Sequence, residues 1–322
     1  MITVVSLGGT IAMTPSSTGG VTPGLGAADL VAAVPELTDF ELTVRSLRSL
    51  PSASLGFADL AELHAVVEAE LAAGAEGVVV TQGTDTLEET AFFLDLTVRA
   101  DAPVVVTGAM RPPASPGADG PANLLGAVRL AASPSARGLG TLVLFSDEVH
   151  AARLVRKTHT ASTGAFESPG FGPLGLLVEQ EPRLLTTPGP RARFPIGSRL
   201  EDVRVCVVPM ALGEDGELLY GVDSRFSGLV LAGVGAGHVP EQVVPVLAEL
   251  AGTMPVVLAS RAGAGSMLTR TYGYPGSERD LIARGLIPSG FLDPYKARIL
   301  LHLLLADGAD RERLRAAFAG FS

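Results

Sequence analysis

The chain has few of the residues that mark several protein classes. Its 322 residues include no tryptophan and one cysteine, Cys206, which cannot form an internal disulfide and, in the apolar run 203–208, is expected to be inert core. The 24 Lys and Arg residues are outnumbered by 34 Asp and Glu. This net negative charge argues against a nucleic-acid partner, because phosphate binding needs a basic face. No apolar run approaches the roughly 20 residues of a membrane span, so no membrane association is expected.

The chain does have a regular alternation of short apolar runs and helical stretches. This spacing is typical of a mostly parallel sheet with helices on both faces. Strands are expected at 2–7, 41–47, 77–81, 103–107, 141–145, 203–208, 228–231 and 255–259. Helices are expected at 28–34, 57–73, 87–99, 121–132, 239–250, 294–306 and 310–318.

These elements fall into two groups, and the chain is long enough for two hydrophobic cores. The expected fold class is α/β, with a larger N-terminal doubly wound, mostly parallel sheet domain at residues 1–180 and a smaller C-terminal α/β domain at 202–322. Residues 181–201 are rich in Pro, Arg and Thr, which predicts a linker. Residues 14–26, rich in Gly, Ser and Pro, suit a mobile lid. No signal-peptide pattern precedes the first strand, so we expect a cytoplasmic protein.

The most informative stretch is residues 77–90, with the sequence G-V-V-V-T-Q-G-T-D-T-L-E-E-T. A buried strand runs into Gly83, and the carboxyl ends of parallel strands are where open α/β sheets bind ligands. Thr84, Asp85 and Thr86 follow in the turn. An N-cap with a capping box is the alternative, but one hydroxyl suffices for a cap and three adjacent polar side chains stand here. The pattern favours a site with a hydroxyl, a carboxylate and free N–H groups.

A second turn of this kind follows the first expected strand, where Gly8, Gly9 and Thr10 come directly after the run 2–7. Paired glycines allow a tight turn and expose the threonine hydroxyl at the end of the strand. A phosphate-binding loop is the alternative, yet this turn carries neither G-x-G-x-x-G nor G-x-x-x-x-G-K-[ST]. Two such turns predict nucleophilic chemistry on a small polar substrate.

Seven sequence blocks follow one another along nearly the whole chain. They are L-G-G-T-I-A at 7–12, V-T-Q-G-T-D-T-L-E-E-T-A at 80–91, V-T-G-A-M-R-P at 106–112, A-D-G-P-A-N-L at 118–124, L-V-R-K-T-H-T at 154–160, L-A-G-V-G-A-G at 231–237 and L-D-P-Y-K-A-R-I-L-L at 292–301. In this order they resemble the bacterial-type L-asparaginase family. One block would be weak evidence, whereas seven in the family's order are strong evidence.

The resemblance implies an amidohydrolase that converts L-asparagine to L-aspartate and ammonia without cofactor or metal. Thr10 matches the threonine that attacks the side-chain amide and forms an acyl-enzyme. Thr84 matches a second threonine, which works with Asp85 and Lys157. A lysine beside a carboxylate is stabilised in its charged form, so Lys157 is interpreted as orienting groups and relaying protons. The alternative for Lys157 is a solvated surface lysine. Which threonine attacks first stays open, and the backbone N–H groups of both are candidate oxyanion donors.

Substrate binding is implied in the same way. Ser52 matches a serine that binds the substrate's α-carboxylate, Asp85 can pair with the α-ammonium, and the carbonyl of Ala109 can accept from the departing amide. Glu278 matches a glutamate of the C-terminal domain that reaches into a neighbouring subunit's site. The resemblance therefore implies a homodimer or homotetramer with shared active sites. A carboxylate in the first turn of a helix is the alternative for Glu278.

The sequence also departs from the family pattern. A lid tyrosine is replaced by Gly20, a substrate-binding glutamine by Ala53, and a neighbour-subunit asparagine by His238. No tyrosine precedes residue 220, so Tyr272 or Tyr274 from an adjacent subunit is a candidate for the missing hydroxyl.

Three other functions stay open. A broader glutaminase-asparaginase would share the same residues. The asparaginase-like subunit of a tRNA-dependent amidotransferase would need an extra domain and a basic RNA-facing surface, and this acidic chain has neither. A non-catalytic amino-acid-binding homologue is the third, which the loss of the lid tyrosine favours and the presence of Thr10 and Lys157 disfavours.

Overall fold

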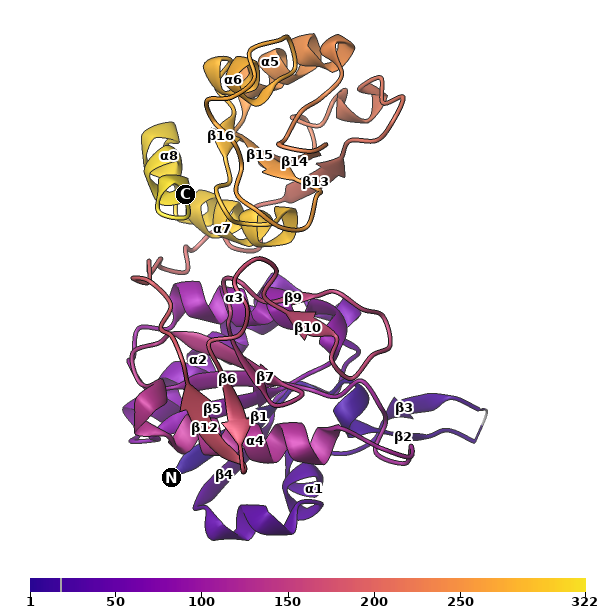
Figure 1. The fold of residues 1–322 in the computed structure, drawn as a ribbon, viewed down its shortest axis with the longest axis vertical. Helices are drawn as coiled ribbons and strands as arrows, with labels where there is room; N and C mark the ends of the chain where they lie inside the picture. The colour runs from indigo at the N-terminus through magenta and orange to yellow at the C-terminus, as the bar shows by residue number, and fades with distance from the viewer. Residues whose placement is uncertain (18) are drawn as a thin grey trace. The chain divides into compact units, whose positions relative to one another are not determined.

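The computed structural model describes residues 1–17 and 19–322. The chain divides into two compact units, Met1–Arg193 and Phe194–Ser322 (Figure 1). The boundary between them falls within the stretch 181–201 that the composition predicts as a linker. Residue 18, which belongs to the expected lid, lies outside the described residues.

The described part of the first unit contains an eight-stranded sheet. From one edge to the other its strands are β4 (Leu42–Ser46), β1 (Ile2–Ser6), β5 (Gly77–Thr81), β6 (Val104–Thr107), β7 (Thr141–Phe145), β8 (Glu148–Ala151), β11 (Gly175–Val178) and β12 (Glu181–Leu184). The first five are parallel, and their carboxyl ends therefore meet at one edge. The last three continue the sheet in antiparallel pairs.

The antiparallel extension was not expected from the sequence, because its two hairpin turns lack the usual Asn-Gly or Asp-Gly signal. Ser146 and Asp147 connect β7 to β8 with φ of 51° and 63°, and Glu179 and Gln180 connect β11 to β12 with φ of 51° and 65°. Two successive left-handed residues form a tight hairpin turn whatever their side chains. Through the second turn, residues 181–184 of the expected linker become a strand of this sheet.

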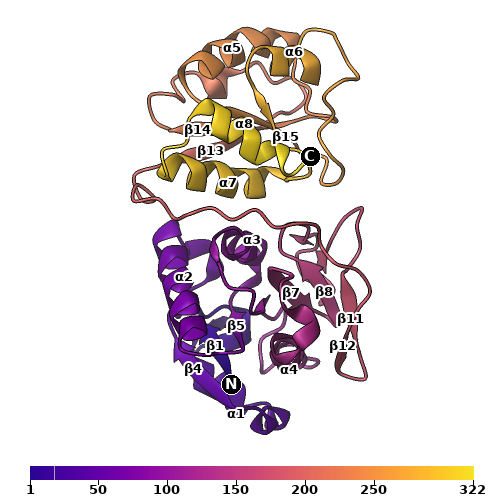
Figure 2. The same ribbon diagram turned by 90° about the vertical axis from the view of Figure 1, so that its left-hand side faces the viewer.

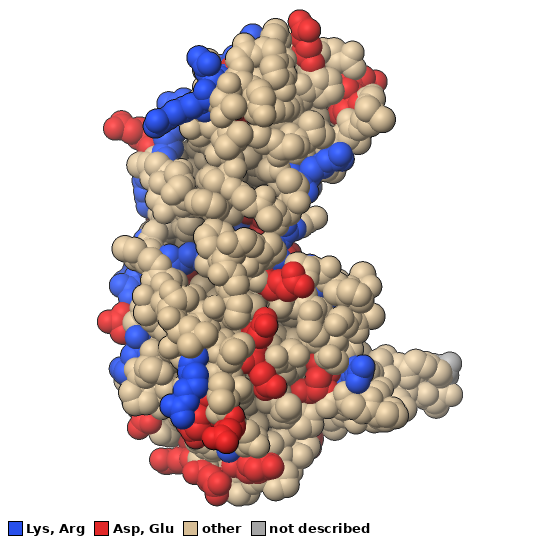
Figure 3. Space-filling model, in the orientation of Figure 1, with Lys and Arg blue, Asp and Glu red and all other residues tan. Residues whose placement is uncertain are grey.

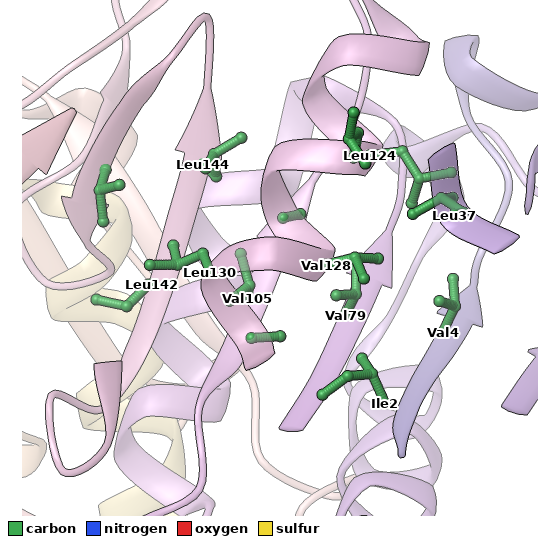
Figure 4. Close-up of a cluster of buried hydrophobic side chains, with 14 of the residues drawn as sticks. Ile2, Val4, Leu37, Val79, Val105, Leu124, Val128, Leu130, Leu142 and Leu144 are labelled. Carbon is green, nitrogen blue, oxygen red and sulfur yellow. The ribbon is translucent and has the colours of Figure 1, made fainter. Parts of the chain in front are cut away.

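Helices cover both faces of the first sheet (Figure 2). They are α2 (Phe57–Ala72) and α3 (Leu87–Thr97) on one face and α1 (Ala27–Ala32) and α4 (Gly120–Ala132) on the other. Alternate strand residues such as Val4, Val79 and Val105 pack against Leu124 and Val128 of α4 (Figure 4). Their neighbours in sequence point to the opposite face, so β1 and β5 are buried along their whole length.

The second unit is a smaller four-stranded parallel sheet in the part that is described. Its strands are, in order, β13 (Val205–Pro209), β14 (Gly228–Gly233), β15 (Val256–Ser260) and β16 (Ile287–Pro288). The helices around it are α5 (Val244–Thr253), α6 (Glu278–Ala283), α7 (Pro294–Ala306) and α8 (Arg311–Ala319). The fold class predicted from the sequence, a larger mostly parallel α/β sheet domain followed by a smaller α/β domain, is confirmed.

Two small two-stranded sheets complete the described strands. They are β2 (Met13–Pro15) with β3 (Val21–Pro23), within the expected lid, and β9 (Arg156–Lys157) with β10 (Phe166–Glu167). On the face shown in Figure 3, acidic side chains gather over parts of the first unit, in keeping with the net charge of −10. Among the described residues, no helix has both the length and the apolar character needed to cross a bilayer.

Candidate active site

The two threonine-bearing turns lie against each other at the carboxyl edge of the first sheet, because β1 and β5 pair in parallel. Gly9 has φ of 86° and ψ of −175°, and a Cβ built on it would lie 2.0 Å from the backbone nitrogen of Gly83. Only glycine permits this conformation together with so close an approach. Thr10 and Thr84, which each follow one of these glycines, are therefore neighbours across the two turns.

Lys157 reaches this edge from β9. Its Nζ atom donates to Thr84 Oγ1 at 2.9 Å and to Asp85 Oδ1 at 2.7 Å. Its backbone N–H donates to the carboxylate of Glu88, which lies in the first turn of α3. The Lys157 side chain is 16 % exposed, so it is not a solvated surface lysine. It joins the hydroxyl and the carboxylate of the second turn into one hydrogen-bonded group.

The two acceptors of Lys157 differ in their access to solvent. Thr84 is buried, whereas 68 % of the Asp85 side chain is exposed. One oxygen of Asp85 is held by Lys157 at 2.7 Å, and a carboxylate can accept further hydrogen bonds. The exposed carboxylate can therefore bind a cationic group of a ligand while it keeps its contact with Lys157.

Ser52 supports the second turn from the loop after β4. Its Oγ atom accepts from the backbone N–H of Asp85 at 3.2 Å, and its carbonyl accepts from the hydroxyl of Thr86 at 2.9 Å. A hydroxyl that accepts one hydrogen bond still has its own O–H to donate, which is what a carboxylate ligand needs. Ala53, where the resembled family has a polar side chain, is exposed beside it.

Ala109 follows β6, the next strand of the sheet, and is fully buried. The preceding residue, Gly108, passes so close to the second turn that a Cβ on it would lie 2.5 Å from the carbonyl oxygen of Gln82. Asn123 Nδ2 donates to the Gly108 carbonyl at 3.0 Å, and the carboxylate of Asp119 accepts from the backbone N–H of Met110 at 2.9 Å. The path of the chain at Ala109 is thus fixed by side chains of α4 and its N-cap.

The structure shows three residues at this edge to which sequence reasoning assigned no role there. Glu88 positions Lys157, while Asp119 and Asn123 hold the loop after β6. The last two stand in the A-D-G-P-A-N-L block, so the sequence did contain a signal for them. Glu88 also stands in a matched block, 80–91, but an acidic residue in the first turn of a helix is ordinary, and nothing in that block indicated a contact with Lys157.

The remaining candidate, Glu278, belongs to the second unit, where it is the first residue of α6 and is fully buried. Its Oε1 atom accepts from the backbone N–H groups of Thr271 at 2.9 Å and Tyr272 at 2.7 Å, and its Oε2 atom lies 3.1 Å from His238 Nε2. Burial works against the charged form, but hydrogen bonds from the backbone and from His238 outweigh it and lower the pKa of Glu278. The carboxylate is therefore ionised at neutral pH.

His238 connects this carboxylate to two tyrosines. The hydroxyl of Tyr274 lies 2.8 Å from His238 Nδ1, and the rings of Tyr272 and His238 meet edge to face with centroids 4.9 Å apart. His238 follows β14 in the loop 233–238, whose glycines allow close contacts: a Cβ on Gly237 would lie 2.2 Å from Met267 Cε. The cluster thus stands at the carboxyl edge of the second unit's sheet.

In the expected lid, the position of the family's tyrosine is occupied by Gly20, which is exposed, has φ of 77° and carries no phenol. Within residues 1–17 and 19–322, no three His, Cys, Asp or Glu side chains are grouped so that they could hold a metal ion. The chemistry available at the first unit's edge is that of two hydroxyls, a lysine and a carboxylate. Such a group can carry out nucleophilic attack and acyl transfer.

Comparison with known families gives matches in both units. Residues 1–189 match the family described as Asparaginase, N-terminal, and residues 204–318 match the Glutaminase/Asparaginase C-terminal domain. The two matches together cover most of the chain.

Curated proteins and solved structures agree with these matches. A probable L-asparaginase of Deinococcus radiodurans is 40% identical over 98% of this chain and 96% of its own length. L-asparaginase 2 of Escherichia coli K12 is 36% identical over 98% of this chain and 92% of its own. The crystal structure of a probable cytoplasmic L-asparaginase from Campylobacter jejuni superposes with a TM-score of 0.90 at 34% identity and covers 99% of this chain and 98% of that one.

Proposed function

This chain belongs to the asparaginase family, and on that premise we propose that it hydrolyses the side-chain amide of L-asparagine, giving L-aspartate and ammonia. The observation that carries the proposal is the contact of Lys157 Nζ with both Thr84 Oγ1 and Asp85 Oδ1, beside the turn that presents Thr10. A hydroxyl next to a lysine–carboxylate pair is suited to proton transfer during acyl transfer.

Thr10 is the proposed nucleophile, and its attack on the carboxamide carbon gives an acyl-enzyme that water then hydrolyses. Thr84 and Lys157 move the proton of the attacking water, and Asp85 keeps Lys157 in place. Thr10 and Thr84 each begin a 3₁₀ turn, so neither backbone N–H is needed inside its turn. These two N–H groups are the proposed donors to the tetrahedral oxyanion.

The substrate's charged end is proposed to lie against the second turn. The exposed carboxylate of Asp85 pairs with the α-ammonium, and the free O–H of Ser52 donates to the α-carboxylate. The carbonyl of Ala109 accepts from the amide nitrogen that departs. This arrangement needs no cofactor and no metal ion.

We further propose that the protein works in the cytoplasm, as the name of the Campylobacter jejuni relative states for that protein. We propose a homodimer or homotetramer in which the C-terminal unit of one copy, with Glu278, completes the site of another. The partner of each site is then a second copy of the same chain, and neither nucleic acid nor a membrane takes part.

The test is ammonia release by the purified protein with L-asparagine and L-glutamine side by side. Thr10→Ala should abolish release. Thr38→Ala, which removes an exposed hydroxyl bound to the Pro35 carbonyl in another 3₁₀ turn, should leave it unchanged. Equal efficiency on the two amides would identify a broader glutaminase-asparaginase, an activity named for a Pseudomonas fluorescens relative that is 32% identical over 98% of this chain and 89% of its own. Binding of asparagine without ammonia release would identify a non-catalytic homologue.

A further inference from the structure

Glu278, His238 and Tyr274 form a continuous hydrogen-bonded series in the second unit. An ionised carboxylate can only accept, so the Nε2 atom of His238 that faces Glu278 carries a proton. In neutral His238 the Nδ1 atom is then an acceptor, and the Tyr274 hydroxyl at 2.8 Å donates to it. The series begins on a carboxylate with no exposed surface and ends on a tyrosine that is 48 % exposed.

This order of groups is that of a proton relay. A carboxylate that fixes the tautomer of a histidine and stabilises its protonated form allows that histidine to take a proton from a hydroxyl. Packing alone does not require the Tyr274–His238 hydrogen bond. The ring of Tyr272 already packs edge to face against His238, and its hydroxyl forms no hydrogen bond with that ring. The series therefore prepares the Tyr274 oxygen to receive a proton from outside the unit.

The first unit has a nucleophile that lacks such an acceptor. Among residues 1–17 and 19–322, nothing forms a hydrogen bond with the Thr10 hydroxyl, while Lys157 is directed at Thr84 and Asp85. The chain's four tyrosines all lie in the second unit, at positions 220, 272, 274 and 295. If the acceptor of the Thr10 proton is a phenol, it therefore comes from a C-terminal unit.

We propose that Tyr274 of a second copy of this chain is a catalytic residue that accepts the proton of Thr10, with His238 and Glu278 as its positioning residues. This rests on the function and the shared-site oligomer proposed above. As the Thr10 oxygen bonds to the carboxamide carbon, its proton passes to the Tyr274 oxygen and the Tyr274 proton passes to His238 Nδ1. When the C–N bond breaks, the same proton returns through Tyr274 to the leaving nitrogen, which departs as ammonia.

The first experiment compares Tyr274→Phe with Tyr272→Phe. Each substitution removes one hydroxyl from a ring that contacts His238, and only the Tyr274 hydroxyl is hydrogen-bonded to it. Tyr274→Phe should lower kcat for asparagine by about 100-fold or more with KM changed less than about threefold, since a general base contributes in that range. Tyr272→Phe should stay close to the wild type. Full kcat in Tyr274→Phe would overturn the proposal.

A second comparison tests His238 as a positioning residue. His238→Phe should lower kcat as far as Tyr274→Phe does, and the double variant should be no slower than either, because residues that act as one unit are not additive. A merely structural role would instead give added losses in the double variant and an altered KM. That result would overturn the relay.

The last experiment tests the transfer between copies. Thr10→Ala chains, expected to be inactive alone, and Tyr274→Phe chains, expected to be about 100-fold slower or more, are unfolded and refolded together. Mixed dimers then contain one site with both Thr10 and Tyr274, and random pairing should restore roughly a quarter of wild-type activity. No recovery would show that Tyr274 does not serve a second copy. A wild-type protein that releases no ammonia from asparagine would end both the proposed function and this inference, whereas an active wild type with an active Tyr274→Phe would end the inference alone.

Discussion

Replacing Gly9 by alanine should disturb the carboxyl edge of the first sheet, which carries the proposed catalytic residues, more than any other glycine-to-alanine substitution in the two turns. Gly9 adopts φ of 86° and ψ of −175°, a region open almost only to glycine, and the new Cβ would lie 2.0 Å from the Gly83 nitrogen and 2.2 Å from its Cα. An ordinary contact begins near 3.4 Å, so the second turn must retreat by more than about 1 Å.

The expected magnitudes follow from these two effects. Backbone strain of this kind costs about 1–3 kcal/mol, and overpacking adds about 1–3 kcal/mol more. A shift of about 1 Å between reacting groups lowers rates by about 100-fold. Gly9→Ala should therefore unfold at a lower urea concentration, and the folded fraction should have a kcat about 100-fold below the wild type.

Gly74→Ala is the matched control. Gly74 has φ of 101° after α2, and a Cβ on it would meet nothing within 4 Å. Gly74→Ala should strain the backbone at a positive φ without a clash of the new Cβ. The free energy of unfolding should therefore fall by about 1–3 kcal/mol, and kcat should equal that of the wild type. Urea unfolding and ammonia release on both variants provide the measurement. Equal kcat for Gly9→Ala and Gly74→Ala would refute the argument that the two turns are held in register by this contact.

Three further predictions concern chemistry and stability. Thr10→Ala and Thr84→Val should each lower kcat by about 1,000-fold or more with unchanged thermal unfolding, and near wild-type ammonia release by either would contradict the two-threonine mechanism. Because Ala53 removes a polar contact that a longer substrate needs, asparagine should be preferred over glutamine by at least ~10-fold in kcat/KM, and equal values would refute this. Burial lowers the pKa of His150 and His302 from 6.5 to about 4, so both fold in the neutral form. Their stabilisation is complete above pH 6.5 and is lost as pH falls toward 4, by up to roughly 3 kcal/mol each. Urea unfolding at about pH 7 and about pH 4.5 measures it, and His302→Gln should flatten the difference.

The parallel core of each unit was predictable because its strands are buried on both faces. Such strands are continuous β-branched runs, and 77–81 and 141–145 were placed with the bounds that the structure has. The antiparallel strands β8, β11 and β12 were not predicted. The residues of β12 are half-exposed, and β8, although mostly buried, contains Glu148 and His150 instead of a continuous β-branched run. Backbone conformation at four left-handed residues, rather than composition, determines where that part of the chain turns.

In the candidate site, the local sequence predicted the two threonine-bearing turns, but it could not predict which side chain contacts Thr84. Lys157 lies on a strand of two residues, β9, which is too short to produce a pattern of its own. Only the resemblance to a family connected it with Thr84, and the structure places its Nζ atom 2.9 Å from that hydroxyl. The contact of Glu88 with Lys157 could not be predicted, because it joins residues distant in sequence through a backbone N–H that any residue possesses.

Glu278 shows how a matched position can act differently from what its side chain suggests. With no exposed surface and its oxygens bonded to Thr271, Tyr272 and His238, the carboxylate could touch a substrate in another subunit only if the loop around it opened. Breaking those hydrogen bonds would leave a buried charge without partners, which is costly. In the proposed oligomer, its influence on a neighbouring site would pass through the group that it orients, and the exposed end of that series is the hydroxyl of Tyr274. If the proposed relay operates, the departure from the family pattern at His238 and the loss of the lid phenol at Gly20 are one change rather than two.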